Sequence, residues 1–142
     1  MKVSARNVFR GKVCAYQPGG VNAEVVVDIG GGDKLVAIIT LESARSLGIA
    51  EGAEVVALVK APWVMVMTDA SGIRLSARNA LSGRVKAVTQ GVVNGEVVVA
   101  LPGGAEVAAV ITKEAVAELG LKPGVDAAVV IKASHVVLGV PA

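Results

Sequence analysis

The residues of this chain that could bind a ligand come in two sets, 72 positions apart. The repeated pieces are Ser-Ala-Arg-Asn, Ile-Thr and Lys-Ala, at residues 4–7 and 76–79, 39–40 and 111–112, and 60–61 and 132–133. Their hydroxyl, guanidinium and ammonium groups are hydrogen-bond donors, and the last two carry positive charge. This collection of donors favours the binding of a small oxyanion.

The whole chain of 142 residues repeats with the same spacing and without a gap. By direct comparison, about 27 of roughly 70 aligned positions are identical, which is the signature of a duplicated unit. The duplication predicts two small domains, residues 1–71 and 72–142, each near the lower size limit for a core that stands alone. The composition is 54% hydrophobic and only 18% charged. We therefore expect the halves to pack on each other and the chain to form oligomers.

Each repeat has the periodicity of three strands, a short helix and two further strands. In the first copy the strands are expected at residues 8–15, 23–29, 34–39, 55–60 and 63–67, and the helix at residues 41–48. Thr40 is a good N-cap for this helix and Gly48 a good residue to end it. The sequence thus predicts an all-β fold, with two tandem OB-type five-stranded barrels that each carry one short helix.

The polar residues named so far, and Ser43 near Thr40, also have purely structural explanations. Thr40 and Ser43 would cap a helix, Lys60 and Lys132 would be solvated strand ends, and Ser-Ala-Arg-Asn would be a shared turn. The first turn of a helix, however, also presents unpaired N–H groups to an anion. The Ser-Ala-Arg-Asn string is retained whole while the residues after it differ between the copies. That retention favours a binding role for the string.

Other classes of protein fit the sequence less well. No apolar run approaches the ~20 residues of a membrane span, and the N-terminus lacks the apolar segment of a signal peptide. The single cysteine, Cys14, cannot form an internal disulfide. The only histidine, His135, is matched by Trp63, so one histidine cannot serve two catalytic sites. We expect a cytoplasmic protein that has no membrane contact, is not an enzyme and offers no direct ligands to a metal cation.

Binding of nucleic acid, the usual role of an OB fold, is also not expected. Aromatic residues make up 2% of the chain and the net charge is only +2, without a run of Lys or Arg. Single-stranded nucleic acid is normally held by stacking on aromatic side chains and by a basic groove. The sequence therefore offers neither of the two features that this ligand requires.

The blocks Ser-Ala-Arg-Asn, Val-Asn-x-Glu-Val, Ile-Thr before a short helix, Leu-Gly and Lys-Ala occur in this order twice. In this they resemble the molybdate-binding Mop domain of molbindins, and most of all the two-domain molbindins. The resemblance covers almost the whole chain. It implies a cytoplasmic protein that binds molybdate or tungstate reversibly for molybdenum storage and homeostasis, with no organic cofactor. It also implies a homotrimer whose oxyanion sites lie between domains of different subunits.

The same resemblance assigns residues to these sites. One side of a site would come from Ser4, Ala5 and Arg6, or from Ser76, Ala77 and Arg78. The other side would come from Thr40, Ser43, Lys60 and Ala61, or from Thr112, Lys132, Ala133 and Ser134. Candidates for further sites near the threefold axis are Val21, Asn22, Val93 and Asn94.

The two copies differ at two of the positions concerned. Ser43 is matched by Ala115, and Pro62 is matched by Ser134. We therefore expect two classes of site with different donors and different affinities.

A shell of donors suits molybdate, which is a tetrahedral dianion with no proton to donate. The hydroxyl group of hydrogen phosphate would find no acceptor in such a shell. Two charged donors would balance the charge of the dianion, and Glu42, next to Thr40, is expected to point outward. Two alternatives stay open at this point: a molybdate-responsive regulatory module that acts through a protein partner, and an OB-fold protein that binds nucleic acid.

Overall fold

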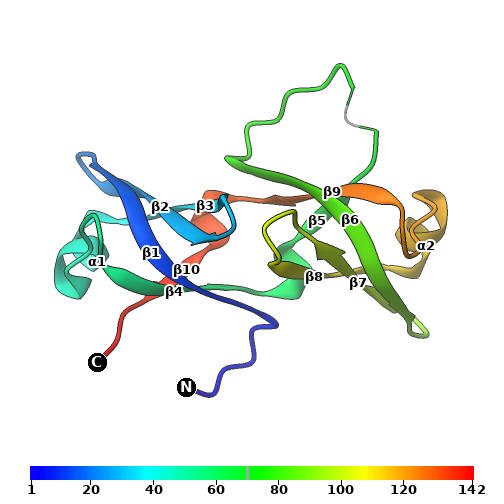
Figure 1. The fold of residues 1–142 in the computed structure, drawn as a ribbon, viewed down its shortest axis with the longest axis horizontal. Coiled ribbons are helices and arrows are strands. Elements are labelled where there is room, and N and C mark those ends of the chain that lie inside the picture. Colours follow the sequence, from blue (N-terminus) through cyan, green and yellow to red (C-terminus); the bar gives the residue numbers. More distant parts are fainter. Residues whose placement is uncertain (70) are drawn as a thin grey trace.

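The structure is a computed structural model that describes residues 1–69 and 71–142. It is an OB-type all-β fold with two five-stranded antiparallel sheets and two short helices (Figure 1). The first repeat forms β1 (Asn7–Pro18), β2 (Asn22–Gly30), β3 (Asp33–Thr40), α1 (Leu41–Leu47), β4 (Glu54–Val59), the 3₁₀ turn η1 (Ala61–Trp63) and β5 (Met65–Met67). The second repeat forms β6 (Asn79–Gln90), β7 (Asn94–Ala100), β8 (Glu106–Thr112), α2 (Lys113–Glu118), β9 (Asp126–Ile131), the 3₁₀ turn η2 (Ala133–His135) and β10 (Val137–Gly139).

The order of elements predicted from the sequence is confirmed, and so are the helix caps. The Thr40 hydroxyl accepts a hydrogen bond from the Ser43 N–H at 3.0 Å, and Gly48 ends α1 in the left-handed conformation with φ 67°. Glu42 is exposed, as expected. One local detail differs, because Trp63 belongs to the turn η1 and the strand that follows begins only at Met65. Within the described residues, neither helix has the length and hydropathy that a membrane span requires.

The last strand of each repeat lies in the sheet of the other repeat. The strand orders are β10-β4-β1-β2-β3 and β5-β9-β6-β7-β8. Strand β5 pairs with β9 through Met65–Val130, and β10 pairs with β4 through Val137–Leu58. The division into residues 1–71 and 72–142 therefore describes the sequence repeat, whereas the sheets themselves exchange a strand across it. The turns η1 and η2 redirect the chain from one sheet to the other (Figure 1).

Each long first strand pairs with two neighbours in succession. The first half of β1 pairs with β4 and the second half with β2, and a bulge lies between Val13 and Ala15. Gly11 stands where β1 passes from one partner to the other. A Cβ atom on Gly11 would clash with the carbonyl oxygen of Asp28, and one on Gly83 in β6 would clash with that of Ala100. The crossing therefore requires glycine in both copies.

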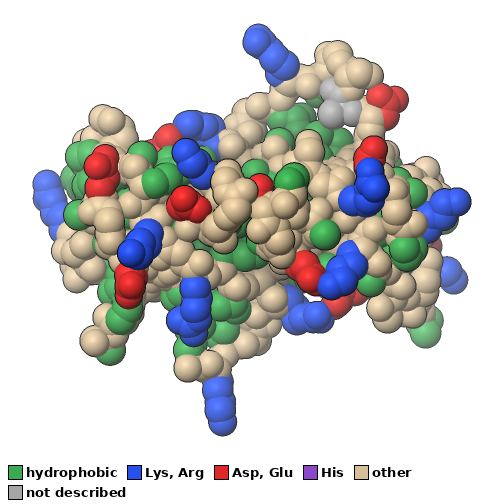
Figure 2. Space-filling model, in the orientation of Figure 1, with side chains coloured by type: hydrophobic (Ala, Val, Ile, Leu, Met, Phe, Trp, Pro, Cys, Tyr) green, Lys and Arg blue, Asp and Glu red, His purple; other side chains and the backbone are tan. Residues whose placement is uncertain are grey.

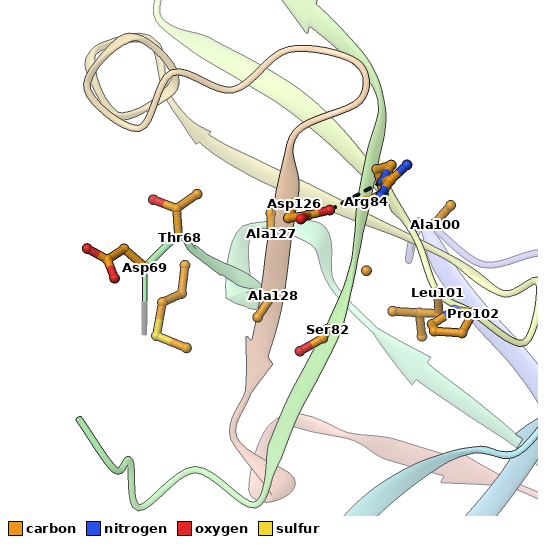
Figure 3. A pocket seen from close by; sticks show the side chains of 12 residues that line it. Thr68, Asp69, Ser82, Arg84, Ala100, Leu101, Pro102, Asp126, Ala127 and Ala128 are labelled. Atoms are coloured by element: carbon orange, nitrogen blue, oxygen red, sulfur yellow. Dashed lines mark hydrogen bonds and ion pairs between the residues drawn. The ribbon is translucent and has the colours of Figure 1, made fainter. Parts of the chain in front are cut away.

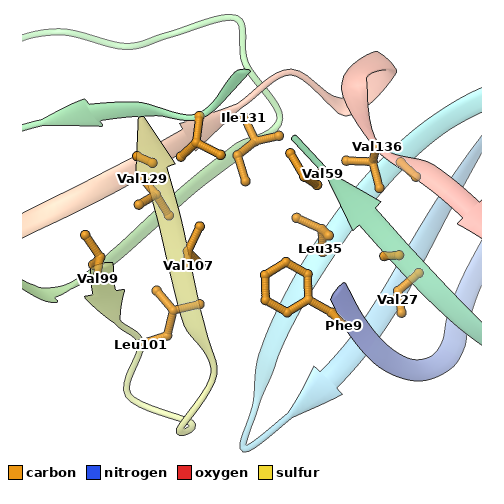
Figure 4. Packing of buried hydrophobic residues seen from close by; sticks show 14 of the residues in the cluster. Phe9, Val27, Leu35, Val59, Val99, Leu101, Val107, Val129, Ile131 and Val136 are labelled. Atoms are coloured by element: carbon orange, nitrogen blue, oxygen red, sulfur yellow. The ribbon is translucent and has the colours of Figure 1, made fainter. Parts of the chain in front are cut away.

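The two sheets share one hydrophobic core. Side chains alternate between core and solvent along the strands, and a single cluster of buried residues includes members of both sheets. Figure 4 shows Phe9 and Val59 of the first sheet on the side opposite Val107 and Ile131 of the second. The expectation that the halves pack on each other is confirmed. Such a common core is the natural outcome when each half alone is near the minimum size for folding.

Two asparagines clamp the halves together. Among the described residues, Asn7 and Asn79 are the only polar side chains that are buried. The Asn79 amide donates to the Val36 carbonyl and accepts from the Val36 N–H, both at 2.7 Å. Asn7 makes the same two bonds to Ala108, at 2.8 and 2.7 Å. Val36 and Ala108 lie in β3 and β8, the outermost strands of their sheets, so each amide occupies a strand edge in place of a further strand.

Equivalent residues of the two repeats meet each other at two places. Gly31 approaches Gly103, and the rings of Trp63 and His135 are 5.0 Å apart between centroids. Each pair is related by the 72-residue shift. An approximate twofold axis therefore relates the halves, and the asparagine bonds, the arginine–glutamate pairs and the exchanged strands each occur in both directions.

The asparagine clamp makes a prediction about stability. Asn79→Ala leaves both the N–H and the carbonyl group of Val36 without their partner, which should lower the free energy of unfolding by about 2–4 kcal/mol. Urea unfolding followed by circular dichroism measures this loss. Gln90→Ala, at an exposed strand end, is the control and should leave the midpoint unchanged. An Asn79→Ala midpoint equal to that of the parent would contradict the role given to the clamp.

Candidate functional site

The Ser-Ala-Arg and Lys-Ala segments of each repeat meet at one sheet edge. Asn79, the first residue of β6, pairs with Ile131, the last residue of β9. Because these strands are antiparallel, residues 76–78 and residues 132–134 leave the sheet side by side. The pairing of Asn7 with Val59 produces the same arrangement in the other half. Two of the predicted segments are thus brought together within one chain.

A cavity of about 320 Å³ lies at the edge of the second sheet. Six of the residues assigned to the sites from the sequence line it: Ser76, Ala77, Arg78, Lys132, Ala133 and Ser134. Thr112, which the sequence grouped with Lys132, is not among the residues that line it. Its apolar walls come from Ile38 in β3, Met65 in the exchanged strand β5, Leu75 and Val130. The first repeat thus supplies part of the wall around the polar residues of the second repeat.

Each site arginine forms a bidentate ion pair with a glutamate of the other repeat. The Arg78 guanidinium donates to both carboxylate oxygens of Glu24, with Nη2 3.0 Å from Oε1. Arg6 pairs with Glu96 in the same way, with Nη2 2.9 Å from Oε1. The expectation of a shell that contains donors alone is therefore wrong at this point. The packing of the halves, which the repeated sequence does not display, is what brings a carboxylate to each arginine.

The face of the sheet that carries Glu24 leads directly to Thr40. Glu24 pairs with Ile38 and Asn22 pairs with Thr40, so these four side chains lie on one face of β2 and β3. Ile38 lines the cavity, and Thr40 is two residues further along the same face, about 7 Å away at the usual rise of a strand. Ser43 is next to Thr40, whose hydroxyl donates to the Ser43 Oγ at 2.8 Å.

The structure therefore combines the predicted residues across the two repeats. Site A consists of Ser76, Ala77, Arg78, Lys132, Ala133 and Ser134, with Thr40 and Ser43 beside it. Site B is its counterpart, with Ser4, Ala5, Arg6, Lys60 and Ala61, and with Thr112 beside it. The packing of η2 on β3 and of η1 on β8 supports this pairing. Thr112 is not grouped with Lys132, although the two belong to the same repeat.

The turns η1 and η2 begin directly after the site lysines. His135 N–H donates to the Lys132 carbonyl at 2.9 Å, which closes η2. The N–H groups of Ala133 and Ser134 precede this bond in the turn. In site B, the Lys60 ammonium lies 5.4 Å from the centroid of the Trp63 ring, within the range of a cation–π contact.

The candidates for axial sites lie in the hairpins beside the threonines. Asn22 pairs with Thr40 and Asn94 pairs with Thr112, while Val21 and Val93 are 78% and 70% exposed. The structure places these residues near the helix ends and leaves their apolar side chains in solvent. Such exposed valines are suited to contact with another protein surface.

The carboxylates of Glu24 and Glu96 are the part of the site that sequence reasoning did not assign. Both stand in the repeated block Val-Asn-x-Glu-Val, so a signal was present. Packing of a hydrophobic core does not explain why a charged residue is identical in both copies. Recognising its partner required the contact between halves.

Two cavities larger than that of site A lie elsewhere among the described residues. One, of about 720 Å³, is lined in part by Arg10, Glu54 and Pro141. A cavity of about 570 Å³ is bounded by Thr68, Ser82, Leu101 and the ion pair between Arg84 and Asp126, whose Nε–Oδ1 distance is 3.2 Å (Figure 3). None of the residues that line it belongs to site A or B. Charged side chains of both signs are interspersed over the face drawn in Figure 2, so that face has no continuous positive stripe.

The fold defines the chain as a tandem OB-type protein whose two five-stranded sheets exchange their last strands. Its sequence matches the TOBE domain profile twice, over residues 3–66 and 75–138. The chain belongs to the TOBE domain family.

Three similar proteins are informative. The chain is 45% identical over 140 residues to the molybdenum transport protein ModE of Azotobacter vinelandii, which is 99% of this chain and 52% of that protein. It is 44% identical over 141 residues to the molybdenum-pterin-binding protein MopA of Rhodobacter capsulatus, 99% of this chain and 53% of that protein. The chain thus spans about half the length of these relatives.

The third is a solved structure of the cytoplasmic molybdate-binding protein ModG in a crystal form with molybdate bound. It is 66% identical to this chain, with a TM-score of 0.96. The similarity covers 99% of this chain and 100% of that one. The two chains therefore share the whole tandem fold.

The arginine–glutamate pair can be measured with a double-mutant cycle. The Arg78 and Glu24 side chains are 52% and 30% exposed, so the coupling free energy should be modest, about 0.5–1 kcal/mol. Urea unfolding of Arg78→Ala, Glu24→Ala and the double variant measures this coupling free energy. The more exposed pair Arg84–Asp126, which has one bond, is the control and should couple more weakly. Equal coupling in the two pairs would contradict the importance given to bidentate geometry.

Proposed function

We propose that the chain binds molybdate or tungstate reversibly at sites A and B. The observation that carries the proposal is the cavity of site A, where serine, arginine and lysine donors converge at the positions named from the sequence. The chain shares its whole fold with a protein whose crystal form contains molybdate. The proposal assigns the same class of ligand to this chain.

The donors of site A match the chemistry of a dianion. The Lys132 ammonium supplies a positive charge with three donors, while Ser76 and Ser134 supply hydroxyl groups. The charge of Arg78 is offset by Glu24, so Lys132 is the main source of positive charge toward the ligand. Both carboxylate oxygens of Glu24 already accept from Arg78. A protonated anion such as hydrogen phosphate would therefore compete with Arg78 for its acceptor.

The role that fits such a protein is storage and homeostasis of the oxyanion in the cytoplasm, by binding and not by catalysis. ModG, which shares the full length of the chain, is described as a cytoplasmic molybdate-binding protein. The interspersed charges of Figure 2 offer a polyanion no basic stripe on that face, which weighs against nucleic acid as the ligand.

Removal of the site lysine tests the assignment. Lys132→Ala should weaken molybdate binding at site A about 10- to 100-fold, because an ammonium group makes charge-assisted hydrogen bonds to the dianion. Isothermal titration calorimetry of the full chain with sodium molybdate measures the loss. Lys122→Ala removes an exposed lysine outside both sites and is the matched control.

The arginine gives a second, independent variant. Arg78→Ala removes one charged donor and leaves the Glu24 carboxylate facing the site, so binding should fall at least as far as in Lys132→Ala. Circular dichroism establishes that the variant is folded. Unchanged calorimetric binding in both Lys132→Ala and Arg78→Ala would overturn the site assignment.

We also propose that the chain assembles as a homotrimer. The apolar side chains of Val21, Val92 and Val93 are 70–93% exposed in the hairpins beside the threonines, and Met65 and Leu75 at site A are about half exposed. Contact with neighbouring chains would cover these side chains and close the open side of the sites.

Native mass spectrometry tests the assembly. The expected mass is three times the 14.2 kDa of one chain. Val93→Glu should shift the population toward the monomer, because it would place an unpaired charge in the contact. Lys122→Ala is again the control. A parent protein that is monomeric at micromolar concentration would refute the trimer without refuting anion binding by one chain.

A further inference from the structure

We propose that sites A and B are unequal, and that site A binds the dianion more tightly and fills first. This inference rests on the proposed function of the sites as oxyanion sites. It depends on how the fold combines the repeats, because each site takes residues from both of them.

Both hydroxyl differences between the repeats fall in the same site. Ser134 lines site A, and its counterpart beside Lys60 in site B is Pro62. Ser43 lies beside site A through its bond to Thr40, and its counterpart near Thr112 is Ala115. If each site were built from a single repeat, each would have one of the two hydroxyl groups and the numbers would be equal. Because the halves cross, site A has both extra hydroxyl groups and site B has neither.

The backbone adds to the difference. Residues 133 and 134 both carry an N–H that precedes the closing bond of η2. In η1 the second of these positions is Pro62, which has no N–H. Site B therefore offers one backbone donor fewer than site A, in addition to the missing hydroxyl groups.

The lysines also differ in their surroundings. Lys60 has the ring of Trp63 at 5.4 Å, and an anion in site B must compete with that ring for the ammonium group. The residue at the corresponding position beside Lys132 is His135, whose own ring lies 5.0 Å from that of Trp63 and is tilted by 35° to it. The approximate twofold symmetry is broken here by the one tryptophan of the chain.

The apolar walls of the two sites also favour tighter binding at site A. Ile38, Met65 and Leu75 line site A. The corresponding residues for site B are Val110, Val137 and Val3, each with a smaller side chain. Larger apolar side chains exclude more water, and polar interactions are stronger where water is excluded.

Calorimetric titration of the full chain with molybdate tests the inference, together with variants that swap the residues that differ between the two sites. The parent should show a tight and a weak class of sites. Ser134→Ala and Ser43→Ala should each weaken the tight class about tenfold, on the order of one hydrogen bond to a charged group, and should leave the weak class unchanged. Pro62→Ser and Ala115→Ser together should strengthen the weak class until the two classes converge.

Ser82→Ala, an exposed hydroxyl outside both sites, is the control and should change neither class. A parent with a single class of equal sites would overturn the inequality and leave the proposed function standing. A Ser134→Ala or Ser43→Ala variant that affects only the weak class would instead overturn the assignment of site A to the tight class. Absence of any molybdate binding in the parent would instead refute the proposed function itself.

Discussion

The structure depends on the reciprocal contact between its two halves. Each half places an asparagine amide against the outermost strand of the other, where the amide bonds a backbone N–H and a carbonyl group, buried at Ala108 and part-buried at Val36. The exchanged strands β5 and β10 add a second link between the halves, because each pairs with a strand of the other repeat. Neither half is large enough to spare these interactions, since a unit of about 70 residues buries too little surface to fold robustly alone.

The Ser-Ala-Arg-Asn string combines structural and binding roles in four residues. In the second copy, its asparagine bonds the edge strand β3 of the first sheet, and its arginine pairs with Glu24 in the adjacent strand β2. The serine and the alanine are thereby held over the cavity of site A. The sequence offered a shared turn and an anion site as alternative explanations for the string. Its asparagine and arginine have structural contacts of their own, and the anion site remains a proposal.

Sequence reasoning went far on local structure because local structure depends on local patterns. Strand alternation, the threonine caps and the left-handed Gly48 all follow from residues close together in the chain. The grouping of Ser-Ala-Arg with Lys-Ala also follows once β1 pairs with β4. The glutamates and the cross-repeat position of Thr40 could not be placed, because they depend on contacts between segments tens of residues apart.

The sequence by itself determined that there are two OB-type units, which polar residues they retain, and that the halves must pack together. Only the tertiary structure decided which segments of the two repeats lie beside one another. A repeat is symmetric under the 72-residue shift, so the sequence is equally compatible with sites built within one copy and sites built across both. The exchange of the last strands and the asparagine clamps choose the crossed arrangement, since only there do the outermost strands and the buried amides find their partners.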